Sequence, residues 1–162
     1  MKFLHYELYK KLCSPNGECF QDEWNHQYAL YLEEFEKVKA FLPKSFLREF
    51  CKNNFHDNVI NSIFLEKQQL KKNVRYNLYI SLSDYYDQSI EHELIFDNID
   101  NFETSLKFNS FAGCCDWLYC EILKIDNNHL SFEVILFDDS IIHFVFTKIH
   151  YRKRKVIDNS GP

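Results

Sequence analysis

The sequence predicts an α+β domain in which N-terminal helices pack on a mainly antiparallel, curled β-sheet of about six strands. Three observations lead to this prediction. Apolar residues recur at helical spacing only in the first third of the chain. Strand-length runs of alternating or continuous apolar residues follow one another over the rest, which is typical of an α+β fold. No long crossover separates these runs, so neighbouring strands are expected to pair antiparallel.

The composition favours a single domain. A chain of 162 residues, 46% of them hydrophobic, can bury a core without disulfides or metals. We divide it into a helical part (1–53), a β-sheet part (54–151) and a basic tail (152–162). The chain has only three Gly, which excludes phosphate-cradling glycine loops and therefore nucleotide-binding P-loop and Rossmann units.

The charge and hydropathy of the chain limit its partners. A net charge of −5 disfavours broad nucleic-acid binding, because such binding depends on neutralising phosphates. The basic run at 152–155 is interpreted as a solvated tail after the last strand, with contact to phosphate or anionic lipid as the alternative. No apolar run approaches the ~20 residues of a membrane span, so no membrane association is expected.

Cysteine usage indicates a reduced, cytoplasmic protein. None of the six cysteines forms a Cys-x-x-Cys pair, and the first residues of the chain are too polar for a secretory signal. Reduced thiols follow as the expectation, and neither a metal nor a cofactor is expected. Cys115 and Cys120 are predicted to be small buried hydrophobes, whereas Cys13 and Cys19 flank a loop where exposure is expected.

Helical patterns come first along the chain. Residues 3–13 carry apolar residues at helical spacing, with a short strand as the alternative. Residues 22–42 form a clear amphipathic pattern that ends before Pro43. The apolar face of this helix is predicted to consist of Trp24, Tyr28, Tyr31, Leu32, Phe35, Val38 and Leu42. A second helix is expected over residues 44–52.

Strand patterns fill the rest of the chain. The predicted strands are 59–66, 74–82, 90–96, 116–125, 130–137 and 141–151. The first has apolar residues on both faces, so we expect it not to be a free edge; the second alternates strictly and is expected to be half solvated. Asp, Asn and Ser make the turns at 126–128 and 138–140. Residues 97–113 are interpreted as either a short helix or a long loop.

Three short motifs carry a family resemblance. They are Leu42-Pro43-x-Ser45-Phe46, Phe55-His56-Asp57-x-x-Ile60 and Trp117-Leu118-Tyr119-x-Glu121-Ile122. Over residues 41–151 the chain resembles an uncharacterised bacterial family, a domain of unknown function found mainly in Bacillus and its relatives. Cys120 stands where that family more typically has an acidic residue. The resemblance implies a helical part that ends at the Leu-Pro motif and a β-rich second half. It implies no established activity, although similar His-Asp-containing β-domains occur near toxin and immunity loci.

His56 and Asp57 are the candidate catalytic residues. A carboxylate beside an imidazole can orient the ring and raise its pKa, as in acid–base sites. Neighbours in a strand point to opposite faces, so the two cooperate only where the strand is bent or just beginning. The alternative is structural: both side chains hydrogen-bond loop amides where the helices give way to the sheet.

Other combinations give weaker predictions. Cys114 and Cys115, with Asp116 and a spatially adjacent histidine, could form a nucleophile or a metal site; the chain offers His92, His129, His143 and His150. His92 and His143 lie within alternating strands, where a satisfied histidine is commoner than a metal ligand. Glu91 and Glu93 share a strand face, as a hydrolase pair does, but a solvated sheet face explains them equally well.

Aromatic residues near acidic positions indicate a binding surface. The candidates are Tyr79, Tyr85, Tyr86, Trp117 and Tyr119. Tyrosine and tryptophan are enriched in protein–protein contacts, whereas an aromatic-rich core is the alternative. We therefore expect a protein-binding module of immunity or inhibitor type. The competing hypothesis is a small hydrolase-like enzyme that uses His56 and Asp57 with a cysteine or carboxylate. Homo-oligomerisation through a sheet edge is the third.

Overall fold

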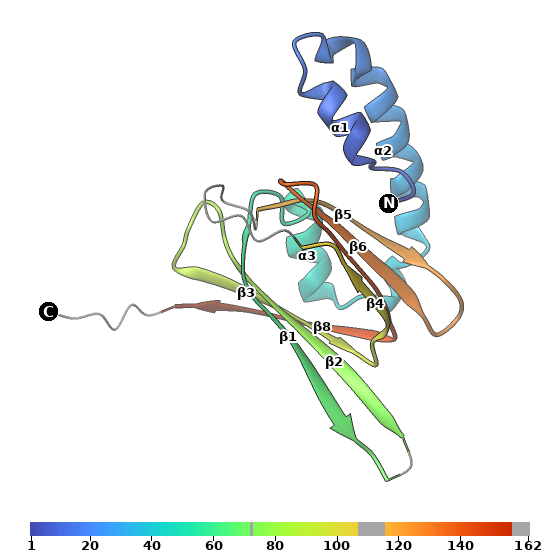
Figure 1. The fold of residues 1–162 in the computed structure, drawn as a ribbon, viewed down its shortest axis with the longest axis vertical. Helices are drawn as coiled ribbons and strands as arrows, with labels where there is room; N and C mark the ends of the chain where they lie inside the picture. Colours follow the sequence, from blue (N-terminus) through green and yellow to red (C-terminus); the bar gives the residue numbers. More distant parts are fainter. Residues whose placement is uncertain (72, 107–115, 157–162) are drawn as a thin grey trace, which may run out of the picture.

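The computed structural model describes residues 1–71, 73–106 and 116–156. Within them, helices α1 to α3 precede strands β1 to β8 (Figure 1). The helices are α1 (Tyr6–Leu12), α2 (Gln21–Glu36) and α3 (Lys44–Asn53). The strands are β1 (Val59–Gln69), β2 (Val74–Ser83), β3 (Ile90–Asp97), β4 (Asp100–Thr104), β5 (Trp117–Lys124), β6 (Leu130–Leu136), β7 (Ile141–Phe146) and β8 (Lys148–Lys155).

The strands form two four-stranded antiparallel sheets, ordered β1-β2-β3-β8 and β4-β7-β6-β5. The predicted α+β class is confirmed. The chain passes from β3 to β4 after two residues, and from β7 to β8 after Thr147 alone. Because β3 pairs with β8 and β4 with β7, the same two chain segments remain partners on both sides of the break. In the described part of the chain the expected six strands are eight, because the predicted strand 141–151 divides into β7 and β8, and β4 was not predicted.

The bend is fixed by side chains at its two breaks. Asn98 has a positive φ of 54°, a conformation that Asn adopts more readily than most residues. Its Nδ2 donates a hydrogen bond to Thr147 Oγ1 at 2.7 Å, and the Thr147 amide donates to the Asp97 carbonyl at 3.1 Å. The prediction of one continuous strand over 141–151 is therefore wrong. Its residues divide between two sheets at Thr147.

The core lies between the facing sides of the bent sheet. Phe96 of β3 packs edge-on against Phe132, Phe144 and Phe146, with ring centroids 4.7–5.1 Å apart. All four side chains are fully buried. Such aromatic pairs add to the free energy gained by burying apolar area.

The buried Cys120 belongs to the same core, as predicted, and Cys13 and Cys19 are exposed. Cys115 lies outside the described residues.

Helix α2 covers the outer edge of β5, and α3 packs beside β8. Tyr31 Oη accepts the Ile122 amide at 3.3 Å, and Asn54 Nδ2 donates to the Cys120 carbonyl at 3.1 Å. These bonds satisfy backbone groups that an edge strand would otherwise leave open. Helix α2 is shorter than predicted. The apolar face predicted for this helix was also too wide: Tyr28 and Leu32 were assigned to it, but both are exposed.

Two glutamates hold the N-terminal segment against the sheet. The buried Glu121 carboxylate accepts the amides of Lys2 and Phe3 at 2.8 Å and that of Leu4 at 2.5 Å. Glu133, on the neighbouring strand, forms an ion pair with the Met1 ammonium. The segment then continues into α1, which confirms the helix predicted within residues 3–13.

Strand β1 is an edge strand, contrary to prediction. Its only partner strand among the described residues is β2. Phe64 on it is 59% exposed, because the β1–β2 hairpin projects from the rest of the fold (Figure 1). The basic run at 152–155 is likewise not a tail: it forms the end of β8. There Arg154 Nε donates to Glu91 at 2.7 Å.

Among the residues described, no helix is long and apolar enough to span a membrane.

The ambiguous stretch 97–113 is only partly described. Its first part forms strand β4, Asp100–Thr104, instead of the helix or long loop that was expected. Residues 107–113 lie outside the described residues. Strand β4 was missed because its sequence, Asp-Asn-Phe-Glu-Thr, contains only one large apolar residue.

Candidate functional site

A cleft of about 420 Å³ opens at the end of the sheet opposite the tip of the β1–β2 hairpin. Four segments meet there: the start of β1, the loop between β2 and β3, the residue before β5 and the residue after β6. We call it the acidic cleft; it is lined by Asp57, Val59, Ser83, Asp84, Tyr85, Gln88, Asp116 and Phe137. It therefore combines three carboxylates with apolar and aromatic walls.

The turn from α3 into β1 brings two of these carboxylates to the same place. Asn54, Phe55 and Asp57 all have positive φ, between 56° and 67°. Such a run is strained for non-glycine residues, and here the fully buried Phe55 ring holds it in place. Beyond the turn, the Asp57 amide donates to the Trp117 carbonyl at 2.8 Å, and Val59 pairs with Asp116. Asp57 and Asp116 thus share one cleft.

The third side of the cleft is the loop at residues 84–89, which we call the tyrosine loop. Asp84 Oδ1 accepts the amides of Tyr86 and Asp87, at 2.9 and 3.1 Å. The Tyr85 amide donates to Oδ1 of the buried Asn58 at 3.1 Å. The backbone of the loop is held by these bonds, while its two aromatic side chains face outward. Tyr85 is 57% and Tyr86 82% exposed, and their rings meet edge to face.

Asp84 is itself held by a buried histidine. Its Oδ2 lies 3.0 Å from His92 Nε2, and His92 Nδ1 lies 2.7 Å from the Tyr151 hydroxyl. His92 is only 2% exposed. The satisfied histidine that the sequence favoured at this position is thus found. Burial opposes ionisation of Asp84, but the bonds from His92 and the loop amides outweigh it and lower the pKa of Asp84.

The charge of the cleft is not neutralised by lysine or arginine in the described part of the chain. Neither residue type forms an ion pair there with Asp57, Asp84 or Asp116; His56 pairs with the first of these and His92 with the second. Burial, followed by the negative charge of Asp57, raises the pKa of Asp116. The cleft is therefore a concave, negatively charged surface with a local excess of carboxylate.

The candidate pair His56 and Asp57 is brought together. His56 Nδ1 lies 2.9 Å from Asp57 Oδ1, because the left-handed conformation of Asp57 breaks the alternation that a strand would impose. Asp57 lines the acidic cleft, whereas the His56 ring packs edge-on against Tyr119. Among the residues described, no Ser, Thr or Cys side chain hydrogen-bonds to His56. The candidate nucleophiles Cys114 and Cys115 lie outside the described residues.

The five aromatic candidates do not form one surface. Tyr85 and Tyr86 lie together on the tyrosine loop. Trp117 is fully buried, so the prediction that it contributes to a surface is wrong; it fills the core, which was the alternative. Tyr119 packs against Trp24. Tyr79 lies on β2 and donates to Glu66 at 2.9 Å.

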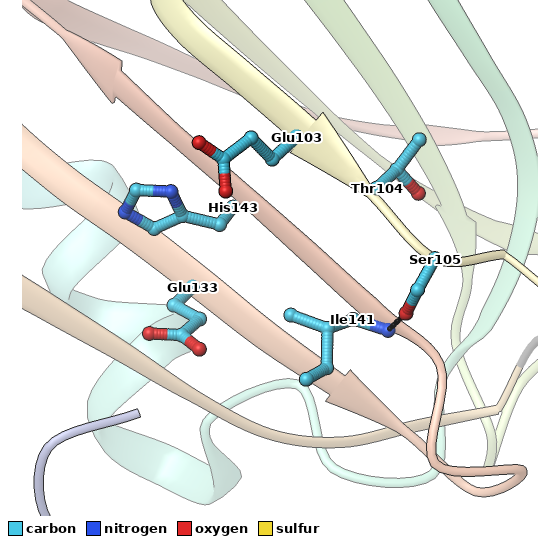
Figure 2. Close-up of a pocket in the computed structure, with 6 residues that line it drawn as sticks. All are labelled: Glu103, Thr104, Ser105, Glu133, Ile141 and His143. Carbon is cyan, nitrogen blue, oxygen red and sulfur yellow. Dashed lines mark hydrogen bonds between the residues drawn. The ribbon is translucent and has the colours of Figure 1, made fainter.

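A second hollow, of about 440 Å³, lies on strands β4, β7 and β6 (Figure 2). Glu103, His143 and Glu133 are register partners across these three strands, and Figure 2 shows their side chains beside one another. Glu133 already binds the Met1 ammonium. No group of three His, Cys, Asp or Glu side chains that suits a metal ion occurs among the described residues.

The remaining predicted groups have structural partners. His150 Nε2 lies 2.8 Å from Asp97, and His129 lies 2.9 Å from Asp126 in the exposed β5–β6 turn. Glu91 and Glu93 pair with Arg154 and Arg152 of β8. A solvated sheet face, the alternative given for these two glutamates, agrees with this pairing.

Sequence reasoning missed Asp116, Val59 and Phe137 as parts of the cleft. Each lies at the boundary of a predicted strand, where the sequence gives no sign of which boundaries meet in space. The backbone contacts of Asp57 with Trp117, of Val59 with Asp116 and of Phe137 with Asp116 reveal that relationship.

Comparisons with known proteins place the chain in no family. No family model matches the sequence, and neither the search of curated proteins nor that of solved structures finds a significant match. The resemblance to the bacterial family therefore stays a prediction. The function has to be argued from the geometry of the acidic cleft and the tyrosine loop.

Proposed function

We propose that the protein is a protein-binding module of inhibitor or immunity type that binds its partner with the tyrosine loop and the acidic cleft. The observation that supports this most is the coincidence of two highly exposed tyrosines with a concave surface rich in carboxylate. Tyr86 exposes 82% and Tyr85 57% of its surface, and tyrosine is enriched in protein–protein contacts.

The chemistry of the cleft indicates what the partner presents. The charge of Asp57 opposes ionisation of Asp116, and a basic side chain between them relieves that repulsion. Val59, Tyr85 and Phe137 line the same cleft and provide apolar contact for the methylene groups of a lysine or arginine. The partner is therefore a protein that presents a basic side chain, with the tyrosines packing around it as anchors.

The arrangement supports binding more than catalysis. The contacts of the tyrosine loop use backbone amides and leave its aromatic rings outward, as in a contact surface. Among the described residues, the His56–Asp57 pair has no hydroxyl or thiol bonded to it.

Site-specific photo-crosslinking tests the proposal. A benzophenone amino acid replaces Tyr86, and the protein is irradiated in an extract of the cells that produce it. The expected result is one dominant cross-linked protein. The double variant Asp57→Asn/Asp116→Asn keeps the shape of the cleft and removes its charge, so the yield should fall at least tenfold; one charged interaction in a buried setting is worth about 1.5–3 kcal/mol.

Two controls make the result specific. The double variant Asp100→Asn/Glu103→Gln removes the same charge from exposed residues of β4 and should leave the yield unchanged. A benzophenone in place of Phe64 probes an exposed aromatic position on the projecting hairpin. Equal cross-linking yields from positions 86 and 64 would contradict the proposed function. A yield that stays the same when the charge of the cleft is removed would contradict it as well.

A further inference from the structure

The contacts of His92 assign it a role in the proposed site, although it is too buried to touch a partner. We propose that His92 is the positioning residue of the tyrosine loop: through Asp84 it fixes the conformation in which Tyr85 and Tyr86 meet the partner. This inference rests on the proposed function and explains how the tyrosine loop keeps its binding conformation before the partner binds.

The position of the His92 ring is fixed from both sides. Phe55 packs edge-on to it with centroids 5.4 Å apart, and Tyr151 stacks on it at 6.0 Å. The ring therefore cannot turn away without disturbing the core. Its Nε2 points out toward Asp84, which is the first residue of the tyrosine loop.

The hydrogen bonds define one tautomer of the neutral ring. The Asp84 carboxylate can only accept, so Nε2 carries the proton, and Nδ1 of the neutral imidazole accepts from the Tyr151 hydroxyl. Burial, and then the charge of Glu49, raises the pKa of Tyr151, which keeps the phenol protonated as the donor. A chain of three side chains, Tyr151 to His92 to Asp84, thus runs from strand β8 to the loop.

The loop depends on the His92–Asp84 end of this chain because the Asp84 carboxylate holds the first turn of the loop. Asp84 Oδ1 holds the amides of Tyr86 and Asp87, while Oδ2 is held by His92. The Tyr86 ring, in turn, packs edge to face on Tyr85, its neighbour in the same loop. Freeing the Asp84 carboxylate from His92 therefore releases the turn that orients Tyr86.

Amide hydrogen exchange on the protein alone tests the positioning. In His92→Leu, which removes the donor to Asp84 and keeps an apolar side chain, exchange of the Tyr86 and Asp87 amides should rise about tenfold. Exchange in the core strand β6 should stay unchanged. His92→Gln retains a donor that reaches Asp84 and should restore most of the protection. Tyr151→Phe alters the other side of the ring and should leave the loop amides protected.

The second readout is capture of the partner by the benzophenone at position 86. Its yield should fall about tenfold in His92→Leu and recover in His92→Gln, a pattern that general destabilisation does not produce. If His92→Leu fails to fold, Asp84→Asn tests the same bond from the exposed side. Asn keeps the oxygen that accepts the two amides but replaces the oxygen that His92 holds by an NH2 group, which cannot accept from Nε2–H, so the same two amides should lose protection.

Each outcome is decisive. Unchanged loop exchange in both His92→Leu and Asp84→Asn overturns the positioning role and leaves the proposed function standing. Faster exchange with undiminished capture overturns it as well, because the loop conformation then does not matter for binding. A wild-type protein that captures nothing overturns the proposed function and this inference with it.

Discussion

Asn98 and Thr147 are joined across the bend of the sheet by a hydrogen bond of 2.7 Å between residues 49 positions apart in the chain. They occupy the two points at which the long strands break. The bond therefore ties the break between β3 and β4 to the break between β7 and β8. Both long strands therefore bend at the same level of the sheet.

Replacing Asn98 tests how much this bond contributes. Asn98→Ala should lower the free energy of unfolding by about 2 kcal/mol, because it loses the hydrogen bond and keeps a Cβ in a left-handed conformation without the side-chain amide that makes Asn tolerant of it. Asn98→Gly loses only the bond and should cost about 1 kcal/mol. Urea denaturation measures both. A glycine variant that is less stable than the alanine variant would contradict this account of the bend.

Replacing the Glu121 carboxylate should lower the free energy of unfolding. Its buried side chain accepts three amides of residues 2–4, and a glutamine has a single acceptor oxygen for them. We expect Glu121→Gln to cost about 2–4 kcal/mol of unfolding free energy. Limited proteolysis should then cut within α1. Glu133→Gln, on the adjacent strand, is the matched control and should cost less than ~1 kcal/mol.

Glu91 provides a pH-dependent test. The Arg154 guanidinium, followed by the Ser81 hydroxyl, lowers the pKa of Glu91 in the folded protein. A carboxyl whose folded pKa lies below its unfolded value of about 4.3 stabilises the fold above that pH, and the contribution disappears as the pH falls through the folded value. Wild type should exceed Glu91→Gln in stability at pH 7, and the difference should shrink as the pH falls below about 4.3. A difference that does not shrink on acidification would mean that charge is not its source.

Asp116 should show the opposite dependence of stability on pH. Its pKa is raised, so the folded state favours the protonated carboxyl, and stability is lost as the pH rises through that value. Asp116→Asn should therefore increase the free energy of unfolding at pH 7 while it weakens partner capture. Thermal denaturation at pH 7 and pH 4 checks this, since the gain should shrink at the lower pH. A loss of stability at pH 7 would show that the carboxylate has a cationic partner in the folded chain.

The sequence predicted the regular parts of this fold well. Helix α2 and the hairpin strands β5 to β7 follow from local periodicity, which the folded chain keeps. The bend could not be predicted, because it depends on Asn98 and Thr147 meeting across two strands. The exposure of Tyr28 and Leu32 was missed for a related reason: α2 covers the edge of β5, a narrower surface than a sheet face.

The candidate site was predicted only in fragments. Tyr85, Tyr86 and Asp57 were identified from residue type, and all three lie at the cleft or on its loop. Trp117 was misassigned because tryptophan favours both cores and interfaces, and sequence alone does not separate them. The contact between Asp84 and His92 spans a strand and a loop, so no local pattern indicates it.

The paired breaks at Asn98 and Thr147 also constrain how the length of this chain can change. Strand side chains alternate between faces, so a single residue inserted on one side of either break would turn the following strand inside out relative to its partner. Compensation would require a second insertion in the opposite strand at the same level. Length variation among natural versions of the protein should therefore gather in the turns, and the number of residues between Ile90 and Thr104, and between Ile141 and Lys155, should stay constant.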